Sequence, residues 1–587
     1  MTNIPPPVVS HQEANRLLTT ALGSPFELEE RVIRGVKLRC WKNGPKSLRT
    51  VWESTQGRTG EYIAFYDENG VVRERITYPE AHKRVSVLAD YLLAAGVVKG
   101  DRVAICMRNW TEWILIFWAI VSIGGIAVPI NAWLTGPESE YCLTDSGSKV
   151  VFCDGERAER LRPHFANLRA AGTTAIVVSR STEDFPGTVT LSSVFQRHAA
   201  AAQKGLPAIE IESDDDATIF YTSGTTGKPK GALATHRGWC SLLMGSPFFI
   251  ARNFLRRGEP LPTPDPNFTP AFLIVTPLFH ATGYAFTQNT TLSGGKIVLM
   301  FKWNPEVALK IIQADKITGF GGVPSLVWQM LEHPTLHKYD TSSLMGLTYG
   351  GAPSAPELMQ EVKRKVPGAI AANGYGMTET CAGIIMNSEE DYLRKPDSVG
   401  VVNAAHDVKI MSEDGTREMP TGQIGEIWMK GPNVVKGYWR KPEANAKTFV
   451  DGFVKSGDLG YVDEEGFVFI RDRSKDMLIR GGENIYSVEV EDALYSHPSV
   501  MEAAVVGIPD RILGELVGAA VQIKPSWAGK VNQQELVNHC KPRLAGFKIP
   551  IFIDIGLEEL PKNPNGKVLK PTVRDAVVAK YLKQSKL

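Results

Sequence analysis

Residues 221–232 read YTSGTTGKPKGA, and this stretch decides the fold class of the chain. The residues before it, 217–221, predict a short buried strand, and residues 233–243 after it predict a helix. Glycines let the backbone approach a ligand closely, N–H groups and hydroxyls donate hydrogen bonds, and lysines supply positive charge. A strand that opens into such a loop before a helix is typical of a phosphate-binding site.

The loop is not a Walker A motif. GxxxxGK[ST] requires Ser or Thr after Gly-Lys, but Pro229 follows Lys228, and no glycine lies five residues before Gly227. An ordinary solvated turn is the alternative, which a loop so rich in glycine, hydroxyls and lysine disfavours. We therefore interpret it as a phosphate-binding loop of another type.

The composition bounds the class of protein. A chain of 587 residues exceeds a single hydrophobic core, so we expect at least two domains. A net charge of +1 gives no reason to expect nucleic acid as a partner. The seven cysteines are scattered without a CxxC pair, which indicates a reducing compartment and neither a disulfide framework nor a zinc site. The first residues contain no signal-peptide pattern.

One uncharged segment resembles a membrane span. Residues 113–130 contain no charged side chain over eighteen residues, which just reaches the spanning threshold. Gly124 and Gly125 divide the segment into a helix and a β-branched strand, so we predict an αβ unit in a soluble core and no transmembrane segment.

The rest of the chain predicts an α/β protein of two unequal domains. Helices and strands alternate with short turns over 77–153 and again over 271–321, which predicts two doubly wound α/β/α subdomains. Short strands separated by glycine turns over 398–471 predict a small β-barrel or an open antiparallel sheet. We expect residues 1–75 to be an N-terminal extension and lead-in, residues 76–472 the catalytic domain, and residues 473–587 a mobile α+β domain.

Further motifs follow the loop in order. They are PLFHATG (277–283), YGGAP (349–353), NGYGMTET (373–380), SGDLG (456–460), RDRSKDMLIRGGENIYSVEVE (471–491), GFKIP (546–550) and PKNPNGKVLK (561–570). Together with the loop, they resemble the signature motifs of the adenylate-forming superfamily, which contains acyl-CoA synthetases, peptide-synthetase adenylation domains and beetle luciferases. The resemblance covers roughly residues 75–570, and no motif position departs from the family pattern.

The resemblance implies a two-step ligase. ATP and a carboxylic acid give an acyl-adenylate and pyrophosphate, and coenzyme A then displaces AMP, with Mg²⁺ neutralising the phosphates. The implied catalytic residues are His280, Thr378, Glu379 and Lys567, with Thr222 and Glu379 as metal ligands. The implied nucleotide and coenzyme A contacts are Thr222, Ser223, Gly224, Thr225, Thr226, Gly227, Lys230, Gly351, Ala352, Asn373, Gly374, Tyr375, Gly376, Met377, Asp458, Arg473, Lys475, Gly482, Glu483 and Lys548. The acyl pocket is implied at His280, Gly283, Tyr284, Phe320, Gly321, Gly322 and Gly350.

The family role of several of these residues is specific. Tyr375 would stack on adenine, and Asp458 would accept from both ribose hydroxyls. Lys475 would be the hinge, Gly482 and Glu483 would face the thiol, and Lys567 would stabilise charge on the α-phosphate. Tyr284 occupies the position of a gating tryptophan in some long-chain members.

Alternatives within the superfamily differ in the second step. A peptide-synthetase module is disfavoured because the chain ends twenty residues after Lys567. A luciferase-like oxygenase shares the first step and stays open. A catalytically dead scaffold would be expected to lose Lys567 or Glu379. The glycines at 283, 321 and 322 suggest an unobstructed pocket for a medium- or long-chain fatty acid, and a 4-coumarate-like aromatic acid is the second interpretation. A monomer or a homodimer fits equally well.

The last three residues are Ser585, Lys586 and Leu587. A C-terminal SKL is the peroxisomal address that an import receptor reads. We therefore expect a peroxisomal matrix enzyme.

Overall fold

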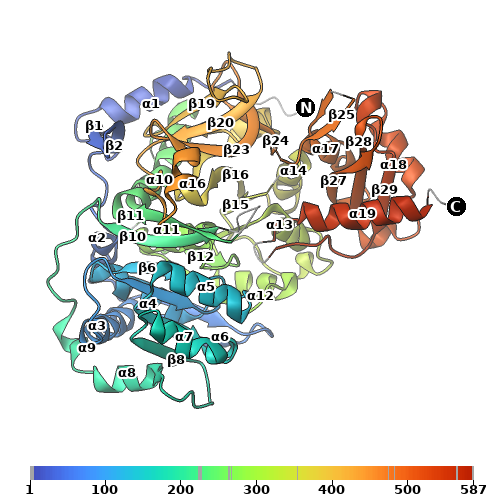
Figure 1. Cartoon of the computed structure of the whole chain (residues 1–587). Helices are drawn as coiled ribbons and strands as arrows, with labels where there is room; N and C mark the ends of the chain where they lie inside the picture. Colours follow the sequence, from blue (N-terminus) through green and yellow to red (C-terminus); the bar gives the residue numbers. More distant parts are fainter. Residues whose placement is uncertain are drawn as a thin grey trace.

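The computed structural model describes residues 6–584 apart from 223–227, 262, 264, 266–267, 353, 474, 482 and 564–565. Figure 1 shows a large N-terminal body and, at one side of it in red, a smaller C-terminal body. This is the α/β architecture that the sequence predicts, with two large sheets, a small β unit and a C-terminal α+β domain.

Within the described residues, the first large sheet has eight strands in the order β21-β11-β10-β6-β5-β7-β8-β9. Its centre is parallel, as the helix–strand alternation predicts, and β10 and β11 pair antiparallel at one side. The strands are β5 (Arg102–Cys106), β6 (Ile126–Pro129), β7 (Val150–Asp154), β8 (Ala175–Ser179), β9 (Val189–Thr190), β10 (Asp216–Thr222), β11 (Lys230–Thr235) and β21 (Gly437–Tyr438).

The second large sheet has nine strands in the described residues, in the order β18-β17-β16-β15-β14-β12-β13-β3-β4. The strands from β3 to β16 run parallel, and β4 and β17 are antiparallel to their neighbours. The strands are β3 (Glu61–Tyr66), β4 (Val72–Thr77), β12 (Ala271–Ile274), β13 (Lys296–Met300), β14 (Gly319–Gly322), β15 (Gly346–Gly350), β16 (Ile370–Met377), β17 (Ala382–Ser388) and β18 (Val401–Val402).

Helices separate the two sheets and cover their outer faces. Because side chains alternate along a strand, Ile63 and Phe65 of β3 enter the core between the sheets, whereas Ala64 and Tyr66 enter the outer core. The inner helices are α2 (Leu48–Glu53), α3 (Tyr78–Ala94), α4 (Thr111–Ser122), α10 (His236–Arg257) and α11 (Ala281–Leu292). The outer helices are α12 (Pro305–Asp315), α13 (Pro324–Leu331), α14 (Pro356–Lys365) and α15 (Glu389–Arg394) on one sheet and α5 (Gly136–Ser146), α6 (Gly155–Leu161) and α7 (Phe165–Ala170) on the other. Short helices α8 (Leu191–Arg197) and α9 (Ala201–Lys204) follow β9.

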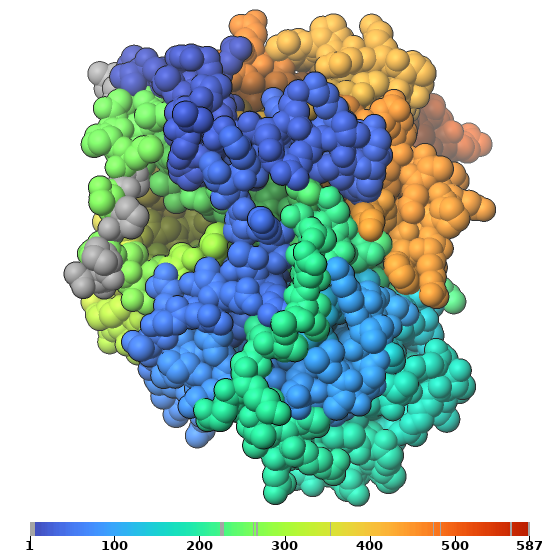
Figure 2. Space-filling model, turned by 90° about the vertical axis from the view of Figure 1, so that its left-hand side faces the viewer, coloured from blue at the N-terminus to red at the C-terminus, as the bar shows by residue number. Residues whose placement is uncertain are grey.

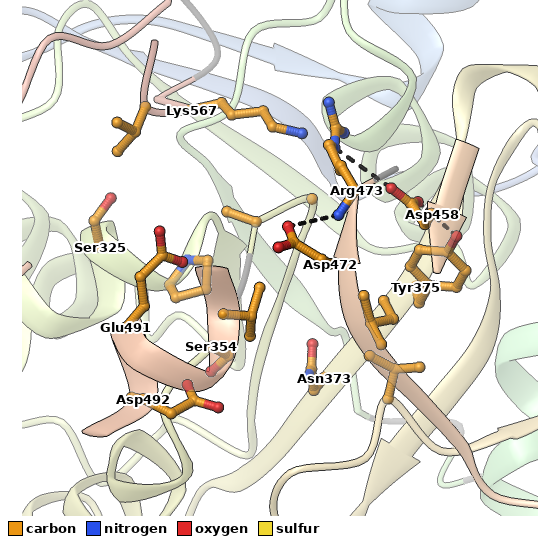
Figure 3. A pocket seen from close by; sticks show the side chains of 18 of the residues that line it. Ser325, Ser354, Asn373, Tyr375, Asp458, Asp472, Arg473, Glu491, Asp492 and Lys567 are labelled. Carbon is orange, nitrogen blue, oxygen red and sulfur yellow. Dashed lines mark hydrogen bonds and ion pairs between the residues drawn. The ribbon is translucent and has the colours of Figure 1, made fainter. Parts of the chain in front are cut away.

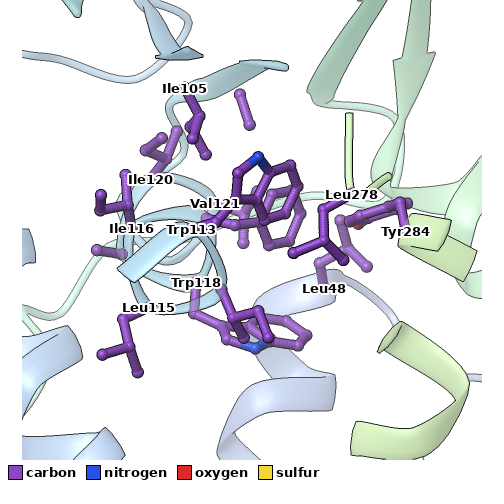
Figure 4. Close-up of a cluster of buried hydrophobic side chains, with 14 of the residues drawn as sticks. Leu48, Ile105, Trp113, Leu115, Ile116, Trp118, Ile120, Val121, Leu278 and Tyr284 are labelled. Carbon is purple, nitrogen blue, oxygen red and sulfur yellow. The ribbon is translucent and has the colours of Figure 1, made fainter. Parts of the chain in front are cut away.

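The uncharged segment 113–130 lies in the inner core. It forms α4 and β6, and Trp113, Leu115, Ile116 and Trp118 are all buried (Figure 4). The ring of Trp118 donates from its indole N–H to Tyr62 at 2.7 Å, so its polar atom has a partner as well. In the part of the chain that the structure describes, no helix is both long and apolar enough to cross a bilayer.

The segment after the phosphate-loop motif differs from the prediction. Residues 230–235 form strand β11, which pairs antiparallel with β10, and the helix α10 begins only at His236. Thr235 caps this helix by accepting the N–H of Gly238 at 3.2 Å. The expected strand–loop–helix unit is therefore wrong, because a β-hairpin encloses the loop and the helix N-terminus lies one strand away from it.

Two smaller units complete the fold. The first is a five-stranded antiparallel sheet of β19 (Asp407–Met411), β20 (Gly425–Lys430), β22 (Phe449–Val450), β23 (Phe453–Val462) and β24 (Val468–Arg473), and α16 (Pro442–Thr448) precedes β22. The C-terminal domain contains β25 (Leu478–Arg480), β26 (Glu483–Ile485), β27 (Val500–Asp510), β28 (Gly514–Ile523) and β29 (Phe552–Gly556), with α17 (Ser487–Tyr495), α18 (Gln533–Cys540) and α19 (Lys570–Gln584). The strand end at Arg473 and the next strand start at Leu478 leave a short connector between these units.

The N-terminal 75 residues are part of the large body and not a separate extension. They supply β3 and α2, and β4 begins within them. Helix α1 (His11–Thr20) and the hairpin of β1 (Leu28–Ile33) and β2 (Val36–Trp41) lie against the green and orange parts of the chain in Figure 2. Arg39 donates to the carbonyl of His406 at 2.8 Å, which ties the hairpin to the small sheet.

A buried ion cluster anchors α1. The carboxylate of Asp391 accepts from Arg256 at 2.8 Å and lies 3.0 Å from His11. Burial acts to raise the pKa of Asp391, but the hydrogen bonds and charges of His11 and Arg256 hold it well below its usual range. The buried guanidinium of Arg256 thus depends on this one carboxylate.

We predict that Asp391→Asn destabilises the large body by about 3–5 kcal/mol at pH 7, because it leaves Arg256 buried without its counter-charge. Chemical denaturation followed by tryptophan fluorescence measures the difference. Since the folded pKa is depressed, this stabilisation is present above the unfolded pKa of about 4 and is lost as the pH falls below it. The surface pair of Asp340 and Lys316 provides the control, and Asp340→Asn should change little. Equal effects of the two substitutions would contradict the prediction.

Candidate active site

A cavity of about 270 Å³ lies between the large body and the C-terminal domain. The large body contributes the segment after β15, the end of β16, and residues of β23 and β24; the C-terminal domain contributes α17 and the loop before α19. Ten of the residues predicted for nucleotide binding and catalysis line it: Gly351, Ala352, Asn373, Gly374, Tyr375, Gly376, Met377, Asp458, Arg473 and Lys567. Figure 3 shows several of their side chains converging from the two domains.

Asp458 is held in place by two neighbours. The Tyr375 hydroxyl donates to one carboxylate oxygen at 2.7 Å, and Nε of Arg473 lies 3.4 Å from the other. Burial and the Asp458 charge raise the pKa of Tyr375 well above its usual range, so the phenol stays a donor. The arrangement presents a fixed carboxylate beside an aromatic ring, which suits a ribose next to a base.

Lys567 brings the C-terminal domain into the cavity. Its backbone N–H donates to Oδ1 of Asn563 at 3.0 Å, which closes the loop before α19. Burial and the nearby Arg473 cation lower the pKa of Lys567 to about 7. An anion that enters the cavity would therefore stabilise the charged form of this ammonium.

His280 belongs to the large body but lies close to Lys567. It lies between β12 and α11 and is the N-cap residue of α11. Its ring accepts the N–H of Thr282 at 3.3 Å. Burial, with a further effect of the Lys567 charge, lowers the pKa of His280 to about 4. The imidazole is therefore neutral at physiological pH.

Glycines allow β15, β16 and β17 to approach one another closely at the cavity. A Cβ on Gly376 would stand 2.0 Å from the carbonyl oxygen of Ala382, and one on Gly350 would stand 2.2 Å from that of Gly374. No other residue fits these positions without moving backbone. Gly350 thus has a packing role, and it does not line the cavity.

Glu379 and Lys230 form a second polar group. The carboxylate of Glu379 is 6% exposed and accepts from the Tyr438 hydroxyl at 2.7 Å, while Nζ of Lys230 lies 5.1 Å from the Tyr438 ring centre. Burial raises the pKa of Glu379.

Other residues predicted for the phosphates lie nearby in the chain. Thr222 donates to the carbonyl of Lys230 at 3.3 Å across the hairpin. Thr378 begins the turn that carries Glu379. The loop residues Ser223, Gly224, Thr225, Thr226 and Gly227 lie outside the described residues.

The acyl-pocket prediction needs correction. The space beside each predicted glycine is filled: a Cβ on Gly283 would meet Pro277 O at 2.4 Å, one on Gly321 would meet the Phe286 ring at 2.8 Å, and one on Gly322 would meet Leu326 at 2.9 Å. These glycines therefore permit close packing, and none of the three lines the cavity between the domains.

Two aromatic residues predicted for that pocket lie elsewhere. Phe320 points to the outer core, where its ring stacks on Trp303 at 5.7 Å. The Tyr284 ring is fully buried, 4.3 Å from that of Trp239 and 4.8 Å from that of Phe117. Neither lines the cavity, because strand and helix periodicity turn both rings into packed cores.

The described residues among those predicted for the hinge and for coenzyme A do not line the cavity either. Lys475 and Glu483 are exposed, and Gly482 lies outside the described residues. Lys548 is occupied by an ion pair with Glu489 at 2.6 Å. This arrangement of the domains places Lys567 inside and the Glu483 segment outside.

Sequence reasoning missed a group of charged residues in the cavity wall. Asp472, Glu491, Asp492 and Lys570 line it, although all four lie within or beside quoted motifs. The available signal was the density of charge within the motif segments 471–491 and 561–570. Among the described residues, no three or more His, Cys, Asp or Glu side chains are grouped as a metal site of their own.

Comparison with known proteins follows this geometry. A family model described as AMP-binding enzyme matches residues 52–439, and one described as AMP-binding enzyme C-terminal domain matches residues 489–567. The long-chain-fatty-acid–CoA ligase FadD13 of Mycobacterium tuberculosis is 34% identical over 506 residues, covering 85% of this chain and 93% of that protein. The feruloyl-CoA synthase of Amycolatopsis sp is 35% identical over 500 residues, with the same coverage.

Solved structures agree with this relationship. The ATP-bound crystal structure of MatB from Rhodopseudomonas palustris has a TM-score of 0.76 and 28% sequence identity, covering 91% of this chain and 100% of that chain. The matched residues include both domains that form the cavity. The chain therefore belongs to the AMP-binding, adenylate-forming enzyme family.

Proposed function

We propose that the cavity between the domains joins a carboxylic acid to AMP and then passes the acyl group to coenzyme A. The chain is an AMP-forming acid–thiol ligase of the family to which it belongs. One observation supports the adenylation step most directly. Lys567 of the C-terminal domain, Arg473 and Asp458 meet in one cavity, next to a tyrosine ring.

The residues of the cavity divide the first half-reaction between them. Asp458, oriented by Tyr375 and Arg473, accepts hydrogen bonds from the ribose hydroxyls. Lys567 stabilises the negative charge that grows on the α-phosphate as the carboxylate attacks, and pyrophosphate leaves. The ammonium has already lost much of its water, so its interaction with that charge is stronger than in solution.

Mg²⁺ fits the second polar group. Glu379 is a buried carboxylate with one hydrogen-bond donor, Tyr438, and it lies at the hairpin that bears Thr222 and Lys230. A single carboxylate with substrate phosphate oxygens is the usual way of holding this ion. Glu379 and the Thr222 hydroxyl would hold it, and it would neutralise phosphate charge. Lys230 adds a fixed cation to the same place.

For the acid, we propose a medium- or long-chain fatty acid. The relatives named as long-chain-fatty-acid–CoA ligases support this substrate. An aromatic acid is the second candidate, since a feruloyl-CoA synthase is equally similar. The ring of Phe286, stacked on Phe272 at 4.8 Å, also lies over Gly321, where it would give a flat apolar wall to an aromatic ring.

The second half-reaction needs another arrangement of the domains. Lys567 and the Glu483 segment belong to the same domain, and here only Lys567 reaches the cavity. We propose rotation about the connector at Lys475, which presents Gly482 and Glu483 to the thiol and releases Lys548 for the nucleotide end of coenzyme A.

A panel of acids tests the function. Pyrophosphate release with ATP, Mg²⁺ and each acid should be highest for one class, and addition of coenzyme A should give the thioester and AMP. Selectivity of about 10–200-fold between neighbouring chain lengths is expected of an apolar pocket. Release of pyrophosphate without any thioester, accompanied by oxygen uptake and light, would point instead to a luciferase-like oxygenase.

The lowered pKa of Lys567 predicts a pH dependence. Only the ammonium form, present below a pKa of about 7 in the free enzyme, can stabilise phosphate charge. We expect kcat/KM for ATP in pyrophosphate release to fall as the pH rises through that value. Lys567→Arg stays charged, so its kcat/KM should not fall over this pH range. Lys567→Ala should lose about 10²–10³-fold activity. If kcat/KM of the arginine variant fell over the same pH range, the fall would belong to the titration of another group.

We also propose that Ser585, Lys586 and Leu587, which lie outside the described residues, direct the chain to peroxisomes. Deletion of the three residues from a fluorescent fusion, with the tag at the N-terminus, should move it from peroxisomes to the cytosol while leaving ligase activity intact. Peroxisomal fluorescence after the deletion would refute the proposal. Substituting Leu587 by alanine provides a smaller change with the same expected result.

A further inference from the structure

Lys570, the first residue of α19, contacts two side chains of α17 at the cavity wall. Its ammonium contacts Oε1 of Glu491 at 2.8 Å and the hydroxyl of Ser487 at 2.5 Å. Ser487 donates both its hydroxyl, at 2.9 Å, and its backbone N–H to the carboxylate of Asp472. We call Asp472, Ser487, Glu491 and Lys570 the hinge network.

The hinge network crosses the connector between the domains. Asp472 belongs to β24, which pairs with β23 in the small sheet of the large body. Ser487, Glu491 and Lys570 belong to the C-terminal domain, and the exposed Lys475 lies between. The hydrogen bonds from Ser487 to Asp472 are thus bonds from one domain to the other.

Lys570 is unusual for its position. The first turn of a helix carries partial positive charge, which disfavours a cation there, and burial disfavours an ammonium further. Although burial acts to lower the pKa of Lys570, the charges of Glu491 and Asp472 outweigh it and raise the pKa. Glu491 is itself fixed, since it also accepts the N–H of Val505 at 2.8 Å. The ammonium is held in place by the hinge network.

Two residues separate Lys570 from Lys567, and both lysines line the cavity. The loop between them has little freedom: the N–H of Leu569 donates to the carbonyl of Pro561 at 2.7 Å. On the other side of Lys567, Gly566 lies against the large body, where a Cβ would stand 2.9 Å from Val323. The position of Lys567 is therefore set by the contact at Gly566 and by the anchor at Lys570.

Carboxylates across the same interface oppose this arrangement. Asp492 of α17 is close enough to Glu357 and Asp397 of the large body that burial, Glu491 and these two residues raise its pKa to about 8. At neutral pH Asp492 is therefore mostly protonated in this arrangement, and the proton that it must take up as the domains meet opposes their closure. The cation of Lys570 supplies an attraction on the side where Lys567 enters.

We infer that Lys570 is a positioning residue for adenylation. It ties the start of α19 to α17, and Ser487 of α17 is bonded to Asp472 near the end of β24, so that Lys567 is held in the cavity while the acyl-adenylate forms. Rotation about the connector separates Ser487 from Asp472, so the hinge network acts in the first half-reaction and not in the second. This inference rests on the proposed function, and it adds a residue on which the alternation between half-reactions depends.

The test measures each half-reaction in Lys570→Met, which keeps the length of the side chain and removes the charge. Single-turnover pyrophosphate release without coenzyme A should slow about 10–100-fold, as expected when a catalytic group is misplaced by about 1 Å. Thioester formation from supplied acyl-adenylate and coenzyme A should stay within about twofold of the wild type, because that step does not use Lys567 in the cavity. Lys570→Arg keeps the charge and should recover most of the first rate.

Lys580→Met is the matched control. Lys580 lies on the same helix and pairs with Asp554 at 2.7 Å, but its side chain is 59% exposed. This variant should match the wild type in both half-reactions. Ser487→Ala removes one link of the hinge network and keeps the backbone N–H, so it should slow the first half-reaction in the same direction as Lys570→Met even where the methionine variant folds poorly.

Limited trypsin digestion gives a readout without activity. Cleavage after Lys475 should be faster in Lys570→Met than in the wild type or Lys580→Met, since the connector is freer when the hinge network is broken. Equal slowing of both half-reactions by Lys570→Met, or unchanged rates with unchanged cleavage, would overturn the inference. A wild-type protein that releases no pyrophosphate with any acid would refute the proposed function instead, and the digestion would still test the hinge network.

Discussion

The burial of one ammonium, that of Lys567, is the interaction on which the arrangement of the two domains depends. Removing an ammonium from water beside the Arg473 cation is unfavourable, and the lowered pKa of Lys567 records that cost. A polyphosphate in the cavity reverses the sign of the interaction. The closed arrangement is therefore stabilised by the substrate that it acts on, and without substrate it relies on contacts elsewhere in the interface.

Local patterns predicted most of the fold because the core follows them. The alternation of Ile63, Ala64, Phe65 and Tyr66 between two cores is the two-residue period that defines a strand buried on both faces. The prediction failed at residues 233–235, which were assigned to the start of a helix and form the end of β11. That segment is a strand because it pairs with β10, and the periodicity of its own residues carries no information about this pairing.

The site shows the same division between local and distant information. Tyr375, Asp458, Arg473 and Lys567 were predicted from motifs, and the structure brings them into one cavity. The acyl pocket was predicted from the absence of side chains at Gly283 and Gly321, which says nothing about what fills the space. The ring of Phe286 fills it in one case and the backbone of Pro277 in the other. A glycine in a sequence is thus weaker evidence for a pocket than a charged residue.

Carboxyl groups that oppose closure across the interface would favour the domain separation that we propose for the second half-reaction. Asp492 faces Glu357 and Asp397, while Lys570 contacts Glu491 and Ser487 and its charge attracts Asp472 of β24. If attraction dominated throughout, the closed arrangement would persist after the adenylate had formed, and the thiol could not enter. If repulsion dominated, Lys567 would seldom reach the phosphate. An enzyme that performs two reactions in one cavity needs the two arrangements to lie within a few kcal/mol of each other, so that the bound intermediate decides between them. A cation at the pivot and carboxylates farther along the interface meet that requirement, because departure of pyrophosphate removes the negative charge that favoured Lys567 in the cavity.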